Sequence, residues 1–214
     1  MSRNQGLLVA LVVVLVIGAV AAAWHFLRPP APAVAVVAVA GDHTMGDPHA
    51  PVVAIEYAAP QCPFCAEMNN TGMPVLKRNY IDTGRVFYIF RVYPIGPADI
   101  PAESIARCLP ADKYFAFIDL LYRNQAKWDP ENGVQDVRGG LIAMARIVGL
   151  DEAKVDRCVN DKDTQKQIIS VAEDAEKRFG ISGTPTFVIN GEVQTPGATW
   201  DEIKSKLDSL LAKK

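Results

Sequence analysis

The sequence predicts an α/β fold in which a block of helices interrupts a core of strands and helices. Residues 52–57 and 86–92 are apolar and rich in β-branched or aromatic side chains, as buried strands are. From residue 97 to 163 the apolar side chains instead recur with the spacing of helices. A strand pattern returns at Thr186–Ile189 and ends at the hairpin signal Asn190-Gly191.

The N-terminal segment is nearly uncharged and apolar from residue 6 to residue 27, with His25 as its only ionisable side chain. It is about 22 residues long, and about 20 suffice to span a bilayer as a helix. The alternative is a cleaved signal peptide ending at Ala21-Ala22-Ala23, but the apolar run continues beyond that site. We expect an uncleaved anchor over residues 1–28, with the rest of the chain exported.

The overall composition excludes several classes of protein. The net charge is −2, and 22 basic residues are balanced by 24 acidic ones, so a nucleic-acid partner is not expected. The chain has only 4 cysteines, too few for a small fold held together by disulfides. We therefore expect a domain with an apolar core that uses its thiols for chemistry.

The first core strand leads into two cysteines separated by two residues, Cys62-Pro63-Phe64-Cys65. Pro63 fits the first turn of a helix, where its missing N–H has no helical partner in any case. A helix that starts at Cys62 presents unpaired N–H groups to the sulfur and favours its thiolate. We expect Cys62 to be the nucleophile in disulfide exchange, and Cys65, one turn on and less exposed, to resolve mixed disulfides.

Such a cysteine pair can also be a static bridge or half of a metal site. A zinc site needs two more ligands nearby, and Cys108 and Cys158 are too far apart in the sequence to form a second pair of this kind. His43 and His49 lack the spacing of a ligand cluster, and we expect both in exposed loops. No metal and no other cofactor is expected.

Glu56 interrupts the apolar pattern of the first core strand, between Ile55 and Tyr57. A buried carboxyl group has a raised pKa, and it could exchange a proton with Cys65. The alternative is a carboxylate at a solvated strand end.

The later helices follow from their caps and breakers. The helix that starts at the cysteine pair is weakened by Asn69-Asn70-Thr71-Gly72, and Pro74 is expected to kink or restart it. A long helix over residues 164–179 ends at Gly180 in the left-handed conformation. A last amphipathic helix starts near Trp200.

Two cysteines lie in the helical block, each on an apolar helical face. Cys108 precedes an apolar stripe that includes Tyr114 and Leu121, and Cys158 follows Asp151, which is expected to cap a short helix. We expect a structural disulfide between them; the alternative is two buried thiols that never meet. Closing a loop of this size stabilises a fold by about 4 kcal/mol in the chain-entropy model.

From Met45 to Leu211 the chain resembles DsbA-like thiol–disulfide oxidoreductases of bacterial envelopes, in the thioredoxin superfamily. The strings that carry the resemblance are Met45-Gly46-Asp47-Pro48, Glu56-Tyr57, Cys62-Pro63-Phe64-Cys65, Tyr80-Ile81-Asp82-Thr83-Gly84 and Gly183-Thr184-Pro185-Thr186-Phe187. The resemblance implies that Pro185 is a cis-proline facing the cysteines and that the Thr184 backbone pairs with an extended substrate.

The resemblance and the composition shifts together predict five segments. They are an anchor (1–28), a Pro/Ala-rich tether (29–44) with an alternative edge strand inside it (34–39), the first half of a thioredoxin-like core (45–96), a helical insertion (97–163) and the second half of the core (164–214).

The expected function is that of an envelope oxidoreductase that passes its disulfide to exported proteins and is reset by a redox partner in the membrane. The periplasmic side of the inner membrane is the expected location, or the soluble periplasm if the N-terminus is cleaved. The tether has no heptads for oligomerisation, which favours a monomeric oxidase. Thr184 and Phe64 depart from the residues common in the DsbA type, and Thr184 favours the alternative, an isomerase or reductase. A second alternative, from another class, is a thioredoxin-fold metallochaperone or binding module.

Overall fold

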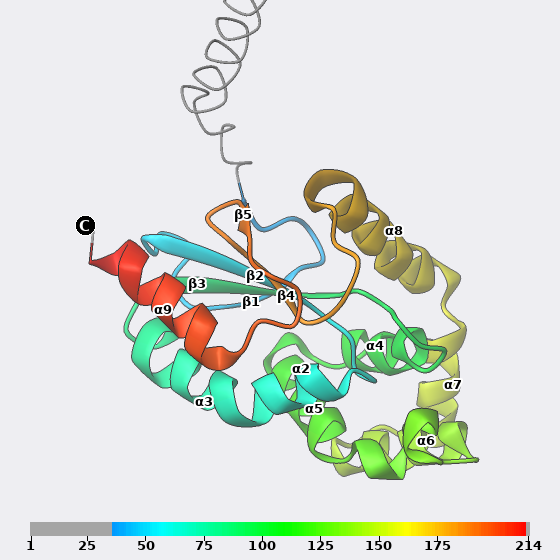
Figure 1. Cartoon of the computed structure of the whole chain (residues 1–214). Helices are drawn as coiled ribbons and strands as arrows, with labels where there is room; N and C mark the ends of the chain where they lie inside the picture. The colour runs from blue at the N-terminus through cyan, green and yellow to red at the C-terminus, as the bar shows by residue number, and fades with distance from the viewer. Residues whose placement is uncertain (1–35, 213–214) are drawn as a thin grey trace, which may run out of the picture. The chain divides into compact units, whose positions relative to one another are not determined.

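The computed structural model describes residues 36–212, in which a five-stranded mixed sheet forms the centre (Figure 1). The strand order is β1-β3-β2-β4-β5; β2 and β3 are parallel, and the other neighbours are antiparallel. The strands are β1 (His43–Met45), β2 (Val52–Ala58), β3 (Val86–Val92), β4 (Thr186–Ile189) and β5 (Glu192–Val193). The two segments predicted as buried strands, β2 and β3, thus lie in the middle of the sheet.

Helices cover both faces of the sheet and build the insertion. The first group follows the cysteine pair and comprises α2 (Pro63–Glu67), η1 (Met68–Gly72), α3 (Met73–Leu76) and η2 (Lys77–Ile81). The insertion comprises α4 (Asp99–Arg107), α5 (Ala111–Arg123), η3 (Gln125–Lys127), η4 (Pro130–Asn132), α6 (Val137–Ile147) and α7 (Glu152–Asn160). The chain continues through α8 (Lys162–Phe179), and α9 (Trp200–Leu211) follows the last strand.

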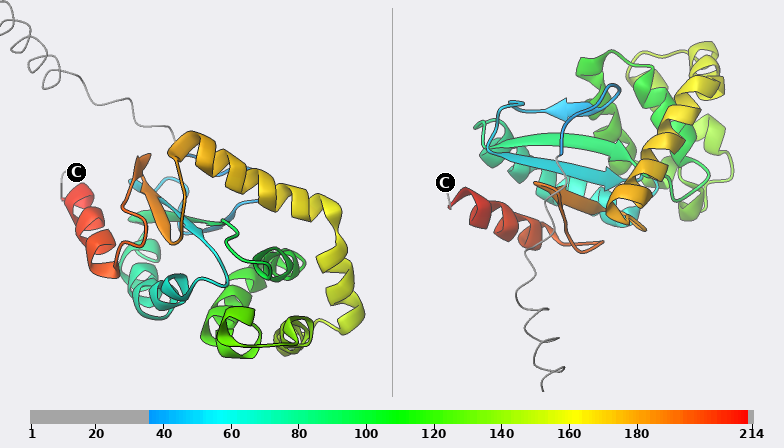
Figure 2. Two further views of the ribbon diagram at one scale, coloured as in Figure 1. Left: turned by 45° about the vertical axis from the view of Figure 1, so that its right-hand side comes forward. Right: turned by 90° about the horizontal axis from the view of Figure 1, so that it is seen from above.

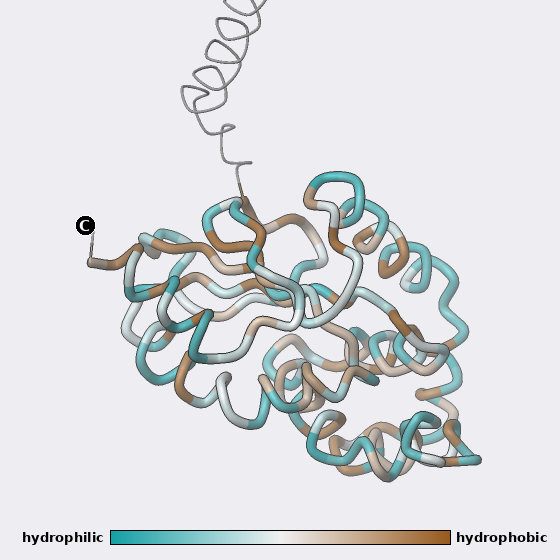
Figure 3. Tube along the Cα trace, viewed as in Figure 1, coloured by the Kyte–Doolittle hydropathy of each residue, from teal (hydrophilic) through white to brown (hydrophobic). Residues whose placement is uncertain are grey.

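Separate apolar clusters lie on the two faces of the sheet. On one face, β2, β3 and β4 pack with the helices after the cysteine pair, with α9 and with the insertion. On the other face, Ile55 and Ile89 pack with Ala175 of α8. Figure 2 shows α8 across one face and α9 with α3 on the other, and Figure 3 shows hydrophobic residues recurring along the strands. Burial of both faces explains why β2 and β3 are continuous apolar runs.

The helix after the cysteine pair continues from Pro63 to Ile81, but it contains two π-helical turns, η1 and η2. Pro74 has no N–H, so a regular helical hydrogen-bond ladder cannot pass through it. At Gly72 an added Cβ atom would lie 3.1 Å from the Trp200 ring, so glycine permits the close approach of α9. The predicted weak point is therefore a change of helical pitch rather than a break.

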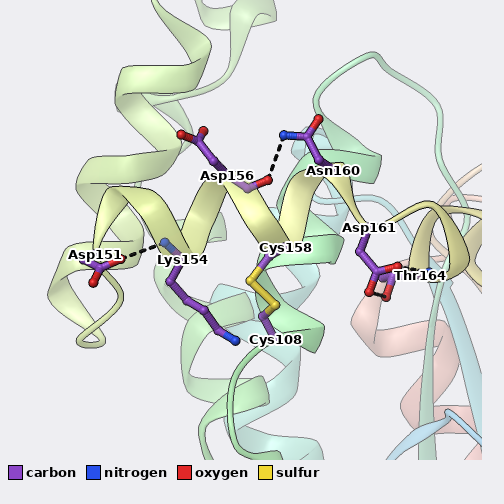
Figure 4. Close-up of a disulfide and its surroundings, with 8 residues drawn as sticks. All are labelled: Cys108, Asp151, Lys154, Asp156, Cys158, Asn160, Asp161 and Thr164. Atoms are coloured by element: carbon purple, nitrogen blue, oxygen red, sulfur yellow. Dashed lines mark hydrogen bonds between the residues drawn. A yellow bond between two sulfur atoms is a disulfide. The ribbon is translucent and has the colours of Figure 1, made fainter.

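A disulfide between Cys108 and Cys158 joins the first and last helices of the insertion (Figure 4). Cys108 is the C-cap of α4, and Cys158 lies on the buried side of α7. Their Cα atoms are 5.9 Å apart across a sequence separation of 50 residues. Asp151 caps α7 as predicted, since its carboxylate accepts a hydrogen bond from the Lys154 N–H at 2.7 Å.

The edge strand β1 was not predicted, and it includes the last two residues of the expected tether. It pairs with β3 from His43 to Met45. The Asp42 carboxylate, just before it, accepts two hydrogen bonds from the Arg91 guanidinium at 2.8 and 2.7 Å. The prediction of an exposed loop at His43 is wrong, because its ring stacks on Tyr114 with 3.3 Å between centroids.

The predicted membrane anchor over residues 1–28 lies outside the described residues. Among the helices of residues 36–212, none has both the length and the apolar character that crossing a membrane requires.

Candidate active site

Cys62 is the N-cap of α2, where the start of a helix leaves N–H groups without helical partners. Pro63 follows in the first turn, and the Cys65 N–H donates a hydrogen bond to Cys62 Sγ at 3.4 Å. As a thiol, Cys62 in turn donates to the Thr184 carbonyl oxygen at 3.4 Å. Since Cys62 is only 2% exposed, these neighbours control the chemistry of its sulfur.

Hydrogen bonds donated to the sulfur stabilise the thiolate form of Cys62. Hydrogen bonding from the Cys65 thiol is the largest effect that lowers the pKa of Cys62, which falls to about 6 although burial opposes the shift. The Thr184 side chain and the backbone N–H groups of Phe64 and Cys65 act in the same direction. At neutral pH the reduced protein therefore carries a thiolate at this position.

Cys65 has the opposite character. It is completely buried, and this burial is the main reason why its pKa is raised well above that of an ordinary thiol. Its hydrogen bond to Cys62 raises the pKa of Cys65 further. Because Cys65 prefers its protonated form, opening a disulfide at this sulfur requires a proton donor nearby.

Glu56 provides a titratable group close to the cysteines. It is 3% exposed, and its Oε2 accepts a hydrogen bond from the Tyr88 hydroxyl at 2.6 Å. Burial raises the pKa of Glu56 to about 7, while the hydrogen bond from Tyr88 opposes the shift. Of the two interpretations of Glu56, the buried carboxyl group is the one found.

A cavity of about 320 Å³ reaches Glu56 between the sheet and helices α3 and α5. Tyr88 and Tyr122 also line it, and the Tyr122 hydroxyl is buried without a hydrogen-bond partner among the described residues. Sequence reasoning missed both tyrosines. The register of β2 against β3 pairs Ala54 with Tyr88 and Glu56 with Phe90, so that Tyr88 lies on the same face of the sheet as Glu56. Only a knowledge of this register would have indicated a role for Tyr88.

On the other side of Cys62 the chain passes through Thr184 and Pro185, whose peptide bond is cis. The Thr184 hydroxyl is buried and has no hydrogen-bond partner in the described part of the chain, so it can donate to a thiolate at Cys62. The structure thus brings Cys62, Cys65, Glu56 and Thr184 together. The disulfide of Cys108 and Cys158 instead joins α4 to α7 in the insertion, and Figure 1 shows α7 well apart from α2.

An open groove of about 480 Å³ lies between α2 and the start of α9. Phe64 and Pro185 line it together with residues from the start of α9, among them Trp200. The Phe64 side chain, which stands between the two cysteines in sequence, is 64% exposed. An apolar ring so exposed beside a reactive sulfur suits contact with another chain.

No group of three or more His, Cys, Asp or Glu side chains that could hold a metal ion occurs in residues 36–212.

The chain is similar in sequence to proteins that are named for disulfide chemistry. A putative protein-disulfide oxidoreductase of Rickettsia bellii (strain RML369-C) is 28% identical over 171 residues, which cover 79% of this chain and 64% of that protein. The chain thus spans less than two thirds of that relative. A probable disulfide bond formation protein D of Bacillus cereus is 29% identical over 174 residues, covering 79% of each.

The fold and the family agree with these similarities. The crystal structure of Wolbachia pipientis alpha-DsbA1 superposes with a TM-score of 0.75 at 27% identity, covering 83% of this chain and 94% of that one. The family model described as thioredoxin matches residues 38–209. The chain therefore belongs to the thioredoxin family, and it is similar in sequence and fold to DsbA-like proteins.

Proposed function

We propose that this chain is a thiol:disulfide oxidoreductase that donates its Cys62–Cys65 disulfide to reduced exported proteins. The observation that carries the proposal is the contrast between the two thiols: Cys62 at the start of α2 has a lowered pKa, and buried Cys65 a raised one. A thiolate stabilised in this way favours the reduced form of the pair, which makes its disulfide an oxidant.

The exchange proceeds in two steps. A substrate thiolate attacks Cys62 Sγ, the bond between Cys62 and Cys65 breaks, and Cys65 leaves and takes a proton from Glu56. A second substrate thiolate then attacks the substrate sulfur of the mixed disulfide and expels Cys62, whose lowered pKa makes it a good leaving group. The substrate loses two electrons and gains a disulfide, and the cysteine pair gains both electrons.

Thr184 and Pro185 have a binding role in this proposal. The backbone of Thr184 pairs with an extended substrate segment beside Cys62, in the manner of an added strand. Apolar substrate side chains then contact Phe64 and the groove that leads to Trp200. Partners of two kinds fit this surface: reduced or misoxidised exported proteins, and a membrane redox partner that reoxidises the cysteines.

The proposed location is the periplasmic face of the bacterial inner membrane. The apolar run of residues 6–27 would anchor the chain there, and a chain cleaved after residue 23 would instead be soluble in the periplasm.

Equilibration of the cysteine pair in glutathione buffers tests the proposal. We expect the disulfide to be strongly oxidising and to oxidise reduced peptides rapidly. Cys62→Ser should abolish exchange, whereas Cys65→Ala should accumulate mixed disulfides, because attack at Cys62 survives and resolution does not. Identical behaviour of the two variants would contradict the assigned roles.

Thr184 supports an isomerase as the second candidate. An isomerase holds a misfolded substrate while the nucleophile attacks repeatedly, and known isomerases do so by pairing two or more catalytic domains around a cleft. Light scattering of residues 36–214 and rescue of scrambled ribonuclease separate the two activities. We expect a monomer with poor rescue; a stable dimer or trimer with efficient rescue would show an isomerase.

A further inference from the structure

The loop that carries Cys62 is held from the helical insertion by Gln125. The Gln125 side-chain amide nitrogen donates to the Pro60 carbonyl oxygen at 2.8 Å and to the Cys62 carbonyl oxygen at 3.2 Å. These two carbonyls lie on either side of Gln61, so one amide group spans the entry of the chain into α2. It bonds to no reacting atom, yet it contacts the backbone of the nucleophile itself.

The position of Gln125 is itself fixed. Its backbone carbonyl oxygen accepts hydrogen bonds from the backbone N–H groups of Trp128 and Asp129 at 3.2 and 2.9 Å. Trp128 is completely buried, and its indole N–H donates to the Leu121 carbonyl at 2.9 Å. The amide of Gln125 therefore extends from an anchored turn rather than from a loose loop.

Gln61 makes a second connection between the same parts. Its side-chain amide donates to Asp129 Oδ1 at 2.8 Å and accepts from the Ala98 N–H at 2.6 Å. Its backbone N–H donates to Asp99 Oδ1 at 2.8 Å, and Gln61 is buried. A Cβ atom at Gly96 would collide with the Gln61 side chain, so glycine leaves the space that this side chain fills.

We propose that Gln125 is a positioning residue through which the helical insertion sets the acidity of Cys62. The inference rests on the proposed function, because it assigns a cause to the thiolate of that same cysteine pair. The Cys62 carbonyl also accepts the Ala66 N–H at 3.0 Å as the first hydrogen bond of the helix. By holding this carbonyl, Gln125 orients the first turn so that its N–H groups face Cys62 Sγ.

The hydrogen bond from the Cys65 N–H to Cys62 Sγ is already long, at 3.4 Å. A small rotation of the N-cap would weaken it, and hydrogen bonds lose strength steeply with distance and angle. Loss of the amide should therefore raise the pKa of Cys62 and make the disulfide less oxidising.

The test compares Gln125→Met, which keeps the length of the side chain but has no N–H donor, with Asn124→Ala. Asn124 is the adjacent residue, and its amide donates to the Leu120 carbonyl at 2.8 Å within its own helix. The control thus removes a similar hydrogen bond without touching the cysteine loop. For each variant we measure thiolate absorbance against pH and thermal unfolding on the reduced protein. The glutathione equilibrium constant is measured separately for each variant.

For Gln125→Met we expect a higher Cys62 pKa and a glutathione equilibrium constant changed by about two- to fivefold, the effect of one hydrogen bond. Asn124→Ala should leave the Cys62 pKa and the glutathione equilibrium constant unchanged, even where it lowers the thermal stability as much as Gln125→Met does. An unchanged pKa and constant in Gln125→Met would overturn the inference.

Two further results keep the inference separate from the proposed function. If the parent protein itself shows an ordinary thiol pKa at Cys62, the proposed function fails before the variants are compared. If Gln125→Met does not fold, Gln125→Ala is measured in its place; failure of both to fold would assign Gln125 to stability and contradict the positioning role.

Discussion

At the scale of single residues, the chemistry proposed for this chain depends on three groups with shifted pKa values. Cys62 has a lowered pKa because hydrogen-bond donors converge on it, whereas Cys65 and Glu56 have raised pKa values because they are buried. Because the pKa values of the two thiols are shifted in opposite directions, Cys62 can leave as a thiolate and Cys65 can be protonated.

Glu56 should make the stability of the protein depend on pH. Its pKa is raised from 4.5 in the unfolded chain to about 7 in the fold, so between these values the native state binds more protons than the unfolded state. The contribution of Glu56 is therefore fully present below pH 4.5 and is lost as the pH rises through about 7. The difference is worth about 3 kcal/mol as an upper estimate.

The variant Glu56→Gln should remove this loss and flatten the stability profile across that interval, as measured by urea unfolding at several pH values. Glu67→Gln, at an exposed position of α2, is the matched control and should leave the profile as in the parent. A profile that keeps its slope in Glu56→Gln would show that another group titrates in this range.

At this scale the sequence singles out the residues proposed to react, but not the residues that support them. Cys62, Cys65 and Glu56 stand out by local pattern alone, since a cysteine pair opens a helix and an acid interrupts an apolar strand. Gln61 contacts Asp129 across 68 residues, and Gln125 contacts Pro60 across 65. Contacts of this kind have no local signal, because they depend on how the insertion packs against the core.

At the scale of elements, two cross-connections stabilise the fold, one within the insertion and one at the sheet. One is the disulfide between α4 and α7, which closes a loop across 50 residues. The other is the ion pair of Asp42 and Arg91, whose side chains are 3% and 5% exposed. Arg91 also donates to the Tyr57 hydroxyl at 3.0 Å, so this pair ties the segment before β1 to the centre of the sheet.

Replacing both Cys108 and Cys158 by alanine should lower the free energy of unfolding by about 4 kcal/mol, chiefly because the unfolded chain regains its freedom. Urea unfolding of parent and variant under oxidising conditions measures this. The glutathione equilibrium of Cys62–Cys65 serves as the control and should change little, because the disulfide lies apart from the site. Equal stability of the two proteins would mean that the cross-link does not form in the native chain.

Asp42→Asn should destabilise the protein by about 3 kcal/mol or more, because it leaves the buried charge of Arg91 without its counter-ion. The matched control is Asp156→Asn, which breaks an exposed ion pair with Arg138 and should cost much less, because exposed ion pairs contribute little to stability. Thermal unfolding of the two variants gives the comparison. Similar costs would mean that the Asp42–Arg91 pair is hydrated like a surface pair.

The elements that were predicted correctly are those with a strong local signal in the sequence. The strands β2 and β3, the cap at Asp151 and the end of α8 at Gly180 were all predicted, since each has a strong local signal. The short strand β1 was missed, because three residues carry no periodicity and their strand geometry comes from pairing with β3. The π-helical turns were likewise predicted only as a weak point of the helix.

At the scale of the whole molecule, the inserted helices do more than enlarge the core. The thioredoxin-like part supplies the cysteine pair, Glu56 and the Thr184–Pro185 segment, and the insertion reaches the same loop through Gln125 and Asp129. The fold class and the insertion were predicted from the order of the elements. The mutual orientation of the two parts was not, because it depends on side chains that meet only in the folded protein.

The acidity of Cys62 tests this account most directly. Thiolate absorbance of the reduced protein is titrated against pH, with Cys62→Ser as the blank. We predict a single transition near pH 6 that disappears in the blank, because hydrogen bonding lowers the pKa of Cys62 to about 6 while Cys65 stays protonated. A first transition near pH 9, the ordinary value for a thiol, would contradict the account.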